Sequence, residues 1–191
     1  MEEPASDIKD LEQQLDAVDG DAQHLVAGLS EEHGCWRARC DSWSVAQCFD
    51  HLAITNRIYM GAMEGAAIRA REKSRLRRRP AIPGLVGRWF VKTIAPPARR
   101  PFRFKAQRII QPGAAPFLST AFASFRASQD EVRAFLRDHS RLDLATVRFP
   151  NPLLPGIRLS LATGLHVIAA HEKRHLWQAW VIRRAAESQA A

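Results

Sequence analysis

The sequence has few cysteines: Cys35, Cys40 and Cys48 are the three among 191 residues. An odd and sparse set of thiols is typical of a reduced protein rather than of a disulfide framework, so we expect a cytoplasmic location. The spacing of these cysteines also lacks the paired Cys-x-x-Cys pattern that builds a zinc ribbon. If the protein holds a metal, the ligands must therefore be of another type.

Long apolar runs are missing as well. No segment approaches the roughly 20 apolar residues that a membrane-spanning helix requires. The chain begins Met1-Glu2-Glu3-Pro4, and this acidic start is unlike a signal peptide, whose first region is basic. Both observations agree with the expectation of a cytoplasmic protein.

Acidic residues are almost absent from one stretch of the chain. Residues 69–108 contain 14 lysines and arginines but a single acid, Glu72, whereas the rest of the chain contains 14 basic and 19 acidic residues. Seven of the eleven prolines lie between Pro80 and Pro116, where they prevent a continuous helix. The pattern predicts a mildly acidic body with one long basic connection over 75–116, which includes a short helix over Leu85–Ile94.

This basic connection is open to three interpretations. Its arginines and aromatic residues, among them Trp89, Phe90, Phe102 and Phe104, could bind nucleic acid or an anionic membrane. The segment could instead lie over the body with its aromatics tucked in and its arginines solvated, which is the interpretation we favour. As a third option, the arginines could attract an anionic substrate to a site in the body.

Apolar residues at helical spacing predict four long helices. A capping box, Ser44-x-x-Gln47, marks the start of the second helix, and Ser160 is a plausible cap for the last. No segment alternates apolar and polar residues over the length of a strand. We therefore predict an all-α four-helix bundle as a single domain over 1–191, with the long connection between the second and third helices. The expected helices cover 6–29, 44–68 with a fading end over 71–79, 117–137 and 160–184.

Two histidines interrupt the apolar stripe of the last expected helix. His171 and His175 are four residues apart, so both imidazoles lie on one helix face. Burying them is unfavourable unless something satisfies their nitrogens, and a metal ion would do so. His51 is the best third ligand, because it lies on the inward face of the second helix. Three histidine ligands leave an open coordination position, as in catalytic zinc sites.

Other arrangements compete with this metal site. The histidine pair alone is also consistent with solvated or partly buried imidazoles that bind nothing, as we expect for the exposed residues His24, His33 and His139. The segment 171–175 fits the His-Glu-x-x-His pattern of zinc proteases. However, Gln178 stands where the longer form of that motif has a glycine, and only 16 residues follow the second histidine, so we do not predict a protease.

Three residues near the histidines are candidates for supporting roles. Glu172 is either a general base at the site or an exposed residue in a surface ion pair. Gln47 and Gln178 lie one turn from expected ligands on the same faces, so they are candidate cofactor-binding residues that orient the imidazoles.

Two short motifs carry a resemblance to a known family. Residues 43–52 (WSVAQCFDHL) resemble the second-helix signature of the DinB/YfiT-like superfamily, and residues 171–178 (HEKRHLWQ) resemble its last-helix signature. The resemblance implies an up-down-down-up four-helix bundle that binds a divalent metal, zinc or nickel, through His51, His171 and His175. It also implies a dimer, and the family includes thiol-dependent transferases and isomerases.

Two classes of function follow from these features. The first is a small metal-dependent enzyme, a thiol-dependent transferase or a hydrolase, in which the ion activates a low-molecular-weight thiol or a water against a small-molecule substrate. The second is a non-catalytic binding module with a structural metal, whose basic segment engages nucleic acid or a membrane surface.

Overall fold

A computed structural model describes residues 5–96 and 107–189 of the chain. The acidic start, residues 1–4, and the part of the basic connection that contains Phe102 and Phe104 lie outside the described residues. The described chain is mostly helical, which confirms the all-α class. Its elements are the helices α1 (Ser6–Val26), α2 (Glu31–Cys35), α3 (Val45–Glu72), α4 (Leu85–Ile94), α5 (Leu118–His139) and α6 (Leu161–Gln189), the 3₁₀ turn η1 (Arg108–Ile110), and the strands β1 (Arg148–Pro150) and β2 (Arg158–Ser160).

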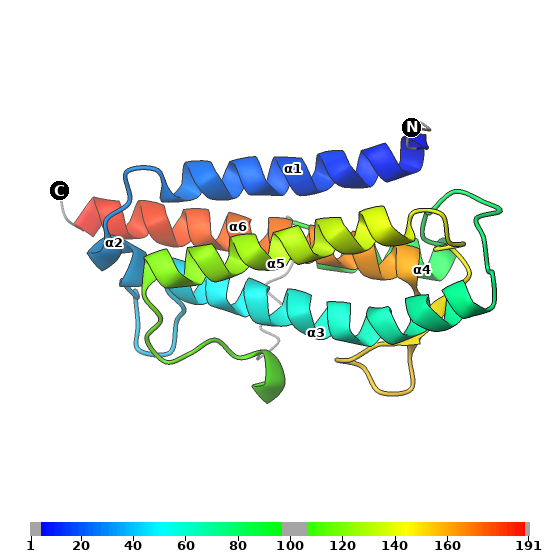
Figure 1. Cartoon of the computed structure of the whole chain (residues 1–191). Coiled ribbons are helices and arrows are strands. Elements are labelled where there is room, and N and C mark those ends of the chain that lie inside the picture. The colour runs from blue at the N-terminus through cyan, green and yellow to red at the C-terminus, as the bar shows by residue number, and fades with distance from the viewer. Residues whose placement is uncertain (1–4, 97–106, 190–191) are drawn as a thin grey trace.

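Four long helices lie side by side and form the body of the molecule (Figure 1). Helix α3 packs against α5 and α6, and α1 packs against α6 and α5. The apolar seam of α1 is buried along its whole length, as its spacing of three and four residues predicts. This seam of α1 consists of Ile8, Leu11, Leu15, Val18, Ala22 and Leu25. None of the described helices combines the length and the apolar character that crossing a membrane requires.

The predicted capping box is present at the start of α3. The Ser44 hydroxyl accepts a hydrogen bond from the backbone N–H of Gln47 at 3.1 Å, and the Gln47 side-chain carbonyl accepts one from the N–H of Ser44 at 3.1 Å. Such a reciprocal pair satisfies two backbone donors that a helix start leaves free, so it fixes where α3 begins. His51 consequently lies near the end of the second turn of α3, facing the bundle interior.

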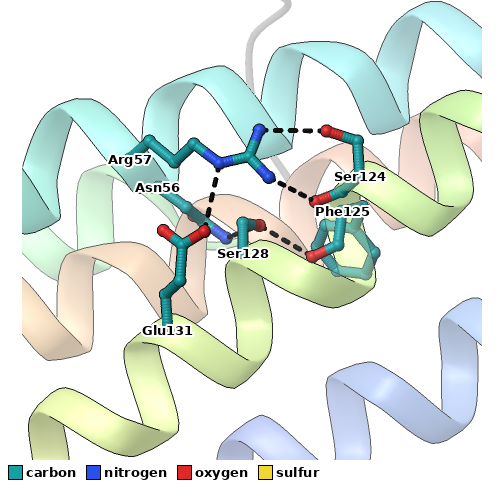
Figure 2. Close-up of polar contacts among 6 residues, drawn as sticks. All are labelled: Asn56, Arg57, Ser124, Phe125, Ser128 and Glu131. Atoms are coloured by element: carbon teal, nitrogen blue, oxygen red, sulfur yellow. Dashed lines mark hydrogen bonds and ion pairs between the residues drawn. The ribbon is translucent and has the colours of Figure 1, made fainter.

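Polar contacts join α3 and α5 along the line where the two helices pack (Figure 2). The Asn56 amide donates to the Ser128 hydroxyl at 3.0 Å, and that hydroxyl donates to the carbonyl of Phe125 at 2.7 Å. Nearer the surface, the Arg57 guanidinium bonds the Ser124 side chain and backbone. Because these bonds have specific geometry, they fix the position of one helix relative to the other along this line.

A small antiparallel sheet was not expected from the sequence. Strand β1 pairs with β2, and Phe149 lies opposite Leu159. Each strand has only three residues, which is too short for an alternating pattern to be recognised in the sequence. The buried ring of Phe149 packs against the bundle, so the sheet closes the core ahead of α6.

The expectation that His139 is exposed is wrong. Helix α5 continues to His139, two residues beyond the predicted end, and the residue therefore joins the inner face of α5. Its ring stacks on Phe135 with centroids 4.4 Å apart, and its Nδ1 lies 2.9 Å from the Phe135 carbonyl. A small helix, α2, also forms within the predicted connection after the first helix.

The described parts of the basic connection contact the body. Helix α4 has the predicted bounds, and it packs on α6. Ahead of it, the Asp7 carboxylate of α1 bonds the guanidinium of Arg77 and accepts the backbone N–H of Ala81 at 2.6 Å. These contacts attach the start of the connection to the beginning of α1.

Candidate metal centre

Helices α3 and α6 bring three histidines together, of which His51 is buried and the other two are half-buried. His51 comes from α3, and His171 and His175 come from consecutive turns of α6. One ring nitrogen from each lies within 4.8 Å of the other two, and the Nε2 atoms of His51 and His171 are 3.2 Å apart. The three residues that the sequence analysis nominated as ligands therefore form one cluster.

The outer nitrogens of two rings have hydrogen-bond partners. His51 Nδ1 lies 2.6 Å from the carbonyl oxygen of Ile110. A carbonyl only accepts, so this nitrogen carries the proton and Nε2 keeps a free lone pair. In the same way, His175 Nδ1 lies 3.0 Å from the side-chain oxygen of Gln178. Each contact turns a lone pair toward the centre of the cluster, which is how outer partners prepare imidazoles for a metal.

The three imidazoles are held in the neutral form. Burial lowers the pKa of His51, and burial together with the neighbouring histidines and Arg174 lowers that of His171 well below its ordinary value. For His175, burial, with help from His51 and Arg174, lowers the pKa to about 3. At neutral pH the cluster therefore presents uncharged nitrogen ligands, the form that binds metal ions.

The cluster has about the dimensions that a divalent metal ion requires. Zinc–nitrogen bonds of about 2.0–2.1 Å place the ligand nitrogens of a tetrahedral site about 3.3 Å from one another. The observed 3.2 Å between the Nε2 atoms of His51 and His171 meets this requirement. Because the three ligand nitrogens are separated by up to 4.8 Å, the imidazoles must move closer together when an ion binds. Three protein ligands leave the fourth position open for water or a substrate atom.

An aromatic side chain covers one side of the cluster. The Trp43 ring lies 4.8 Å from the ring of His51 and 5.7 Å from that of His175, measured between centroids. Trp43 precedes the cap of α3, and no role at the site is predicted for it from the sequence. Because indole is bulky and apolar, this contact limits how the two imidazoles can turn and shields them from water.

The segment after η1 is tied to the first turns of α3. The Gln47 amide donates to the carbonyls of Gly113 and Ala114 at 3.0 and 3.3 Å, and the Asp50 carboxylate accepts the N–H of Gly113 at 2.7 Å. Gln47 thus supports the segment that supplies the carbonyl partner of His51, and bonds no imidazole itself. Its role in cofactor binding stays a prediction.

Glu172 lies in a second buried polar cluster beside the first. Its side chain is 0% exposed, so the alternative of a surface ion pair is wrong. Its Oε1 accepts from the Asn56 amide at 2.8 Å, whereas Oε2 has no hydrogen-bond partner among the described residues. Burial raises the pKa of this carboxyl to about 7. A role as general base stays a prediction, and it requires the carboxylate to act from the α3–α5 side of α6.

Cys48, three residues before His51 in α3, carries an unreactive thiol. Cys48 is buried, and burial raises the pKa of its thiol to about 12, so it is protonated at neutral pH.

Comparison with known proteins identifies the family of the chain. The family model of the DinB superfamily matches residues 14–179, a range that contains all three histidines. No curated protein and no solved structure matches the chain.

Proposed function

The chain belongs to the DinB superfamily, and from this premise we propose that it is a small metal-dependent enzyme. The observation that carries the proposal is the cluster of His51, His171 and His175, which offers three neutral nitrogens to one ion and leaves a coordination position open. The imidazole set suits zinc or nickel. The proposed reaction is a thiol-dependent transfer or a hydrolysis of a small molecule.

Bound in this cluster, such an ion lowers the pKa of a coordinated water to about 7 or deprotonates a coordinated thiol. The surrounding residues supply the other requirements of either reaction. Gln178 and the Ile110 carbonyl orient two of the ligands, and Trp43 keeps water from one side. Glu172 is the proposed proton acceptor, supported by its buried position next to His171 in the chain and by its unpartnered Oε2.

The proposal includes an up-down-down-up four-helix bundle as the scaffold of the site. In Figure 1, α1 and α6 run in one direction and α3 and α5 run in the other, which supports this topology. The long connection between α3 and α5 allows two neighbouring helices to run in parallel, since a short loop joins only antiparallel neighbours.

The metal site is tested by elemental mass spectrometry on tag-free protein. We expect about one zinc or nickel ion per chain, lost in the His51→Ala and His175→Ala variants because each removes a ligand. His24→Ala is the matched control, since His24 is an exposed histidine at the end of α1, and it should keep the ion. Folded wild-type protein that carries no metal and takes up none on addition would refute the metalloenzyme.

The two proposed reactions are distinguished by proton release. A thiol that binds the metal as thiolate releases its proton, so titrating 2-mercaptoethanol into metal-loaded protein at constant pH should consume about one equivalent of base. The His51→Ala variant should show no such release. If wild type shows none either, but cleaves an activated ester at a rate that His51→Ala loses, the hydrolase is the correct member of the pair.

A further inference from the structure

Helix α4 presents two different faces. Phe90, Val91 and Ile94 pack against the core, and Gly87 lies so close to α6 that a Cβ atom there would meet the Thr163 hydroxyl at 2.6 Å. The opposite face carries Leu85, which is 78% exposed, together with Val86 and Trp89. A helix that is anchored through one apolar face and exposes a second is unusual on a protein surface.

The exposed face is apolar where it points away from the body. Val86 is 79% exposed and Trp89 67% exposed. At 100° per residue, Leu85, Trp89 and Val86 fall within one arc of α4. The arc also contains the exposed Thr93, and Arg88 and Lys92 lie along one of its edges. Ile82, half exposed, extends the patch toward a cavity of about 370 Å³ that Arg79 and Arg88 also line. The patch is therefore apolar at its centre and basic at its border.

Further cations surround this patch. A second cavity, of about 590 Å³, is lined by five basic residues of the turn before α4. The acids that face it are few: Asp7 pairs with Arg77, and Asp143 lies 4.0 Å from Arg79. The other cations of the turn and of α4 have no carboxylate partner in the described parts of the chain. These cations are Lys73, Arg75, Arg78, Arg88 and Lys92.

We propose that the outer face of α4 and the basic turn before it form a docking surface for an anionic lipid bilayer. Leu85, Val86 and Trp89 insert at the level of the headgroups, and the flanking arginines and lysines contact the lipid phosphates. Tryptophan and aliphatic residues on one face of a helix with a basic border are the features of helices that lie in the bilayer interface, and clustered cations add attraction to anionic lipids.

Charge decides between this partner and the alternatives. A second copy of the chain would bring the same excess of positive charge against itself, because residues 69–108 carry 14 basic residues and one acid. Nucleic acid would satisfy the cations, but its phosphates would leave the apolar centre uncovered. A bilayer with anionic headgroups satisfies both parts of the surface at once.

Flotation of full-length protein with vesicles tests the proposal. We expect binding to vesicles of phosphatidylcholine mixed with phosphatidylglycerol, and little binding to phosphatidylcholine alone. The double variant Leu85→Ser/Trp89→Ser should lose binding. Phe117→Ser is the matched control, because Phe117 is also 67% exposed but precedes α5 rather than lying on α4; it should bind like wild type.

A charge variant separates the two contributions. Each cation near an anionic surface contributes a factor of about 5 in affinity, so Arg88→Gln/Lys92→Gln should bind roughly 25-fold more weakly. Arg184→Gln, at the exposed far end of α6, is its control. Circular dichroism and metal content are measured for each variant to establish that it is folded.

Three results would overturn the proposal. The first is absence of binding to anionic vesicles at low salt. The second is binding that survives Leu85→Ser/Trp89→Ser, especially with equal affinity for duplex DNA, which would assign the cations to nucleic acid. The third is a dimer in light scattering that the same variant converts to a monomer without changing vesicle binding, which would assign the apolar face to a second copy.

Discussion

Replacing glycine by alanine should have opposite effects on stability at two positions in the long helices. Gly164 lies at the start of α6, where an added Cβ would come within 2.8 Å of Met63 Sδ and of the Phe149 ring. Gly61, on the outer side of α3, has no neighbour within 4 Å of an added Cβ. Replacing glycine by alanine in a helix stabilises by about 0.5–1 kcal/mol when there is room, because the unfolded chain loses freedom.

The magnitudes follow from these contacts. At Gly61 the gain is uncompensated, so Gly61→Ala should raise the unfolding temperature by about 1–4 °C. At Gly164 overpacking costs about 1–3 kcal/mol, which outweighs the gain in helix propensity. The two effects leave a net loss of up to about 2.5 kcal/mol, so Gly164→Ala should lower the unfolding temperature by up to about 10 °C. Because His171 follows on the same helix two turns later, displacement of α6 should also weaken metal binding.

Thermal unfolding followed by circular dichroism measures both variants against wild type, with a chelator present so that metal affinity does not enter. Metal affinity is then measured separately by competition with a chromogenic chelator. If Gly164→Ala unfolds at the wild-type temperature or above, the close packing of α6 on Met63 and Phe149 is not what holds the two helices, and the reasoning fails.

Three further predictions test other contacts. Burial alone would raise the pKa of Asp7, but its bonds, first among them that to Arg77, lower it from the ordinary 3.8. In urea unfolding, Asp7→Asn should therefore lower the stability at neutral pH. Its effect should shrink as the pH falls from 3.8 through the lowered pKa. Gln178→Ala removes the acceptor for His175 Nδ1 and should weaken metal binding about 10–100-fold in a chelator competition. Burial raises the pKa of Glu172 from 4.5 to about 7, so ionising this carboxyl lowers the stability of the folded protein. This loss is absent below pH 4.5, the unfolded pKa, and complete above pH 7, the folded pKa. In metal-free protein, the free energy of unfolding of Glu172→Gln should therefore exceed that of wild type by up to about 3 kcal/mol near pH 8, and by little near pH 4.

The parts of the fold that depend on local pattern were predictable. Apolar spacing located the four long helices, and the Ser44 cap fixed the register of α3, which places His51 on the inner face. The spacing of four placed His171 and His175 on one face of α6. No pattern in a single sequence shows that α3 and α6 are neighbours. However, histidines on the inner faces of two helices in one bundle both lie in the shared interior, so they are expected to be close together.

The parts that depend on long-range contacts were not predictable. The partner of His51 is the backbone carbonyl of Ile110, and a carbonyl is present at every residue, so the sequence carries no signal for it. Trp43 carried a weak signal, as a large aromatic just before the cap of the ligand-bearing helix. Glu172 lies 100° around α6 from His171, and only the packing of α3 and α5 on that side shows that it is buried rather than exposed.

The burial of Glu172 is the observation that most needs a functional explanation. A carboxyl that is fully buried, accepts one hydrogen bond from Asn56 and leaves Oε2 unpartnered destabilises the charged form without a return in packing. A glutamine of the same shape would keep the bond from Asn56 without placing a charge in the buried site. A residue that lowers stability, although a single substitution would remove the cost, is expected where selection maintains it for function. If Glu172→Gln gains stability and keeps its metal but loses turnover, the carboxyl serves the reaction; if it keeps full turnover, the carboxyl has no part in it.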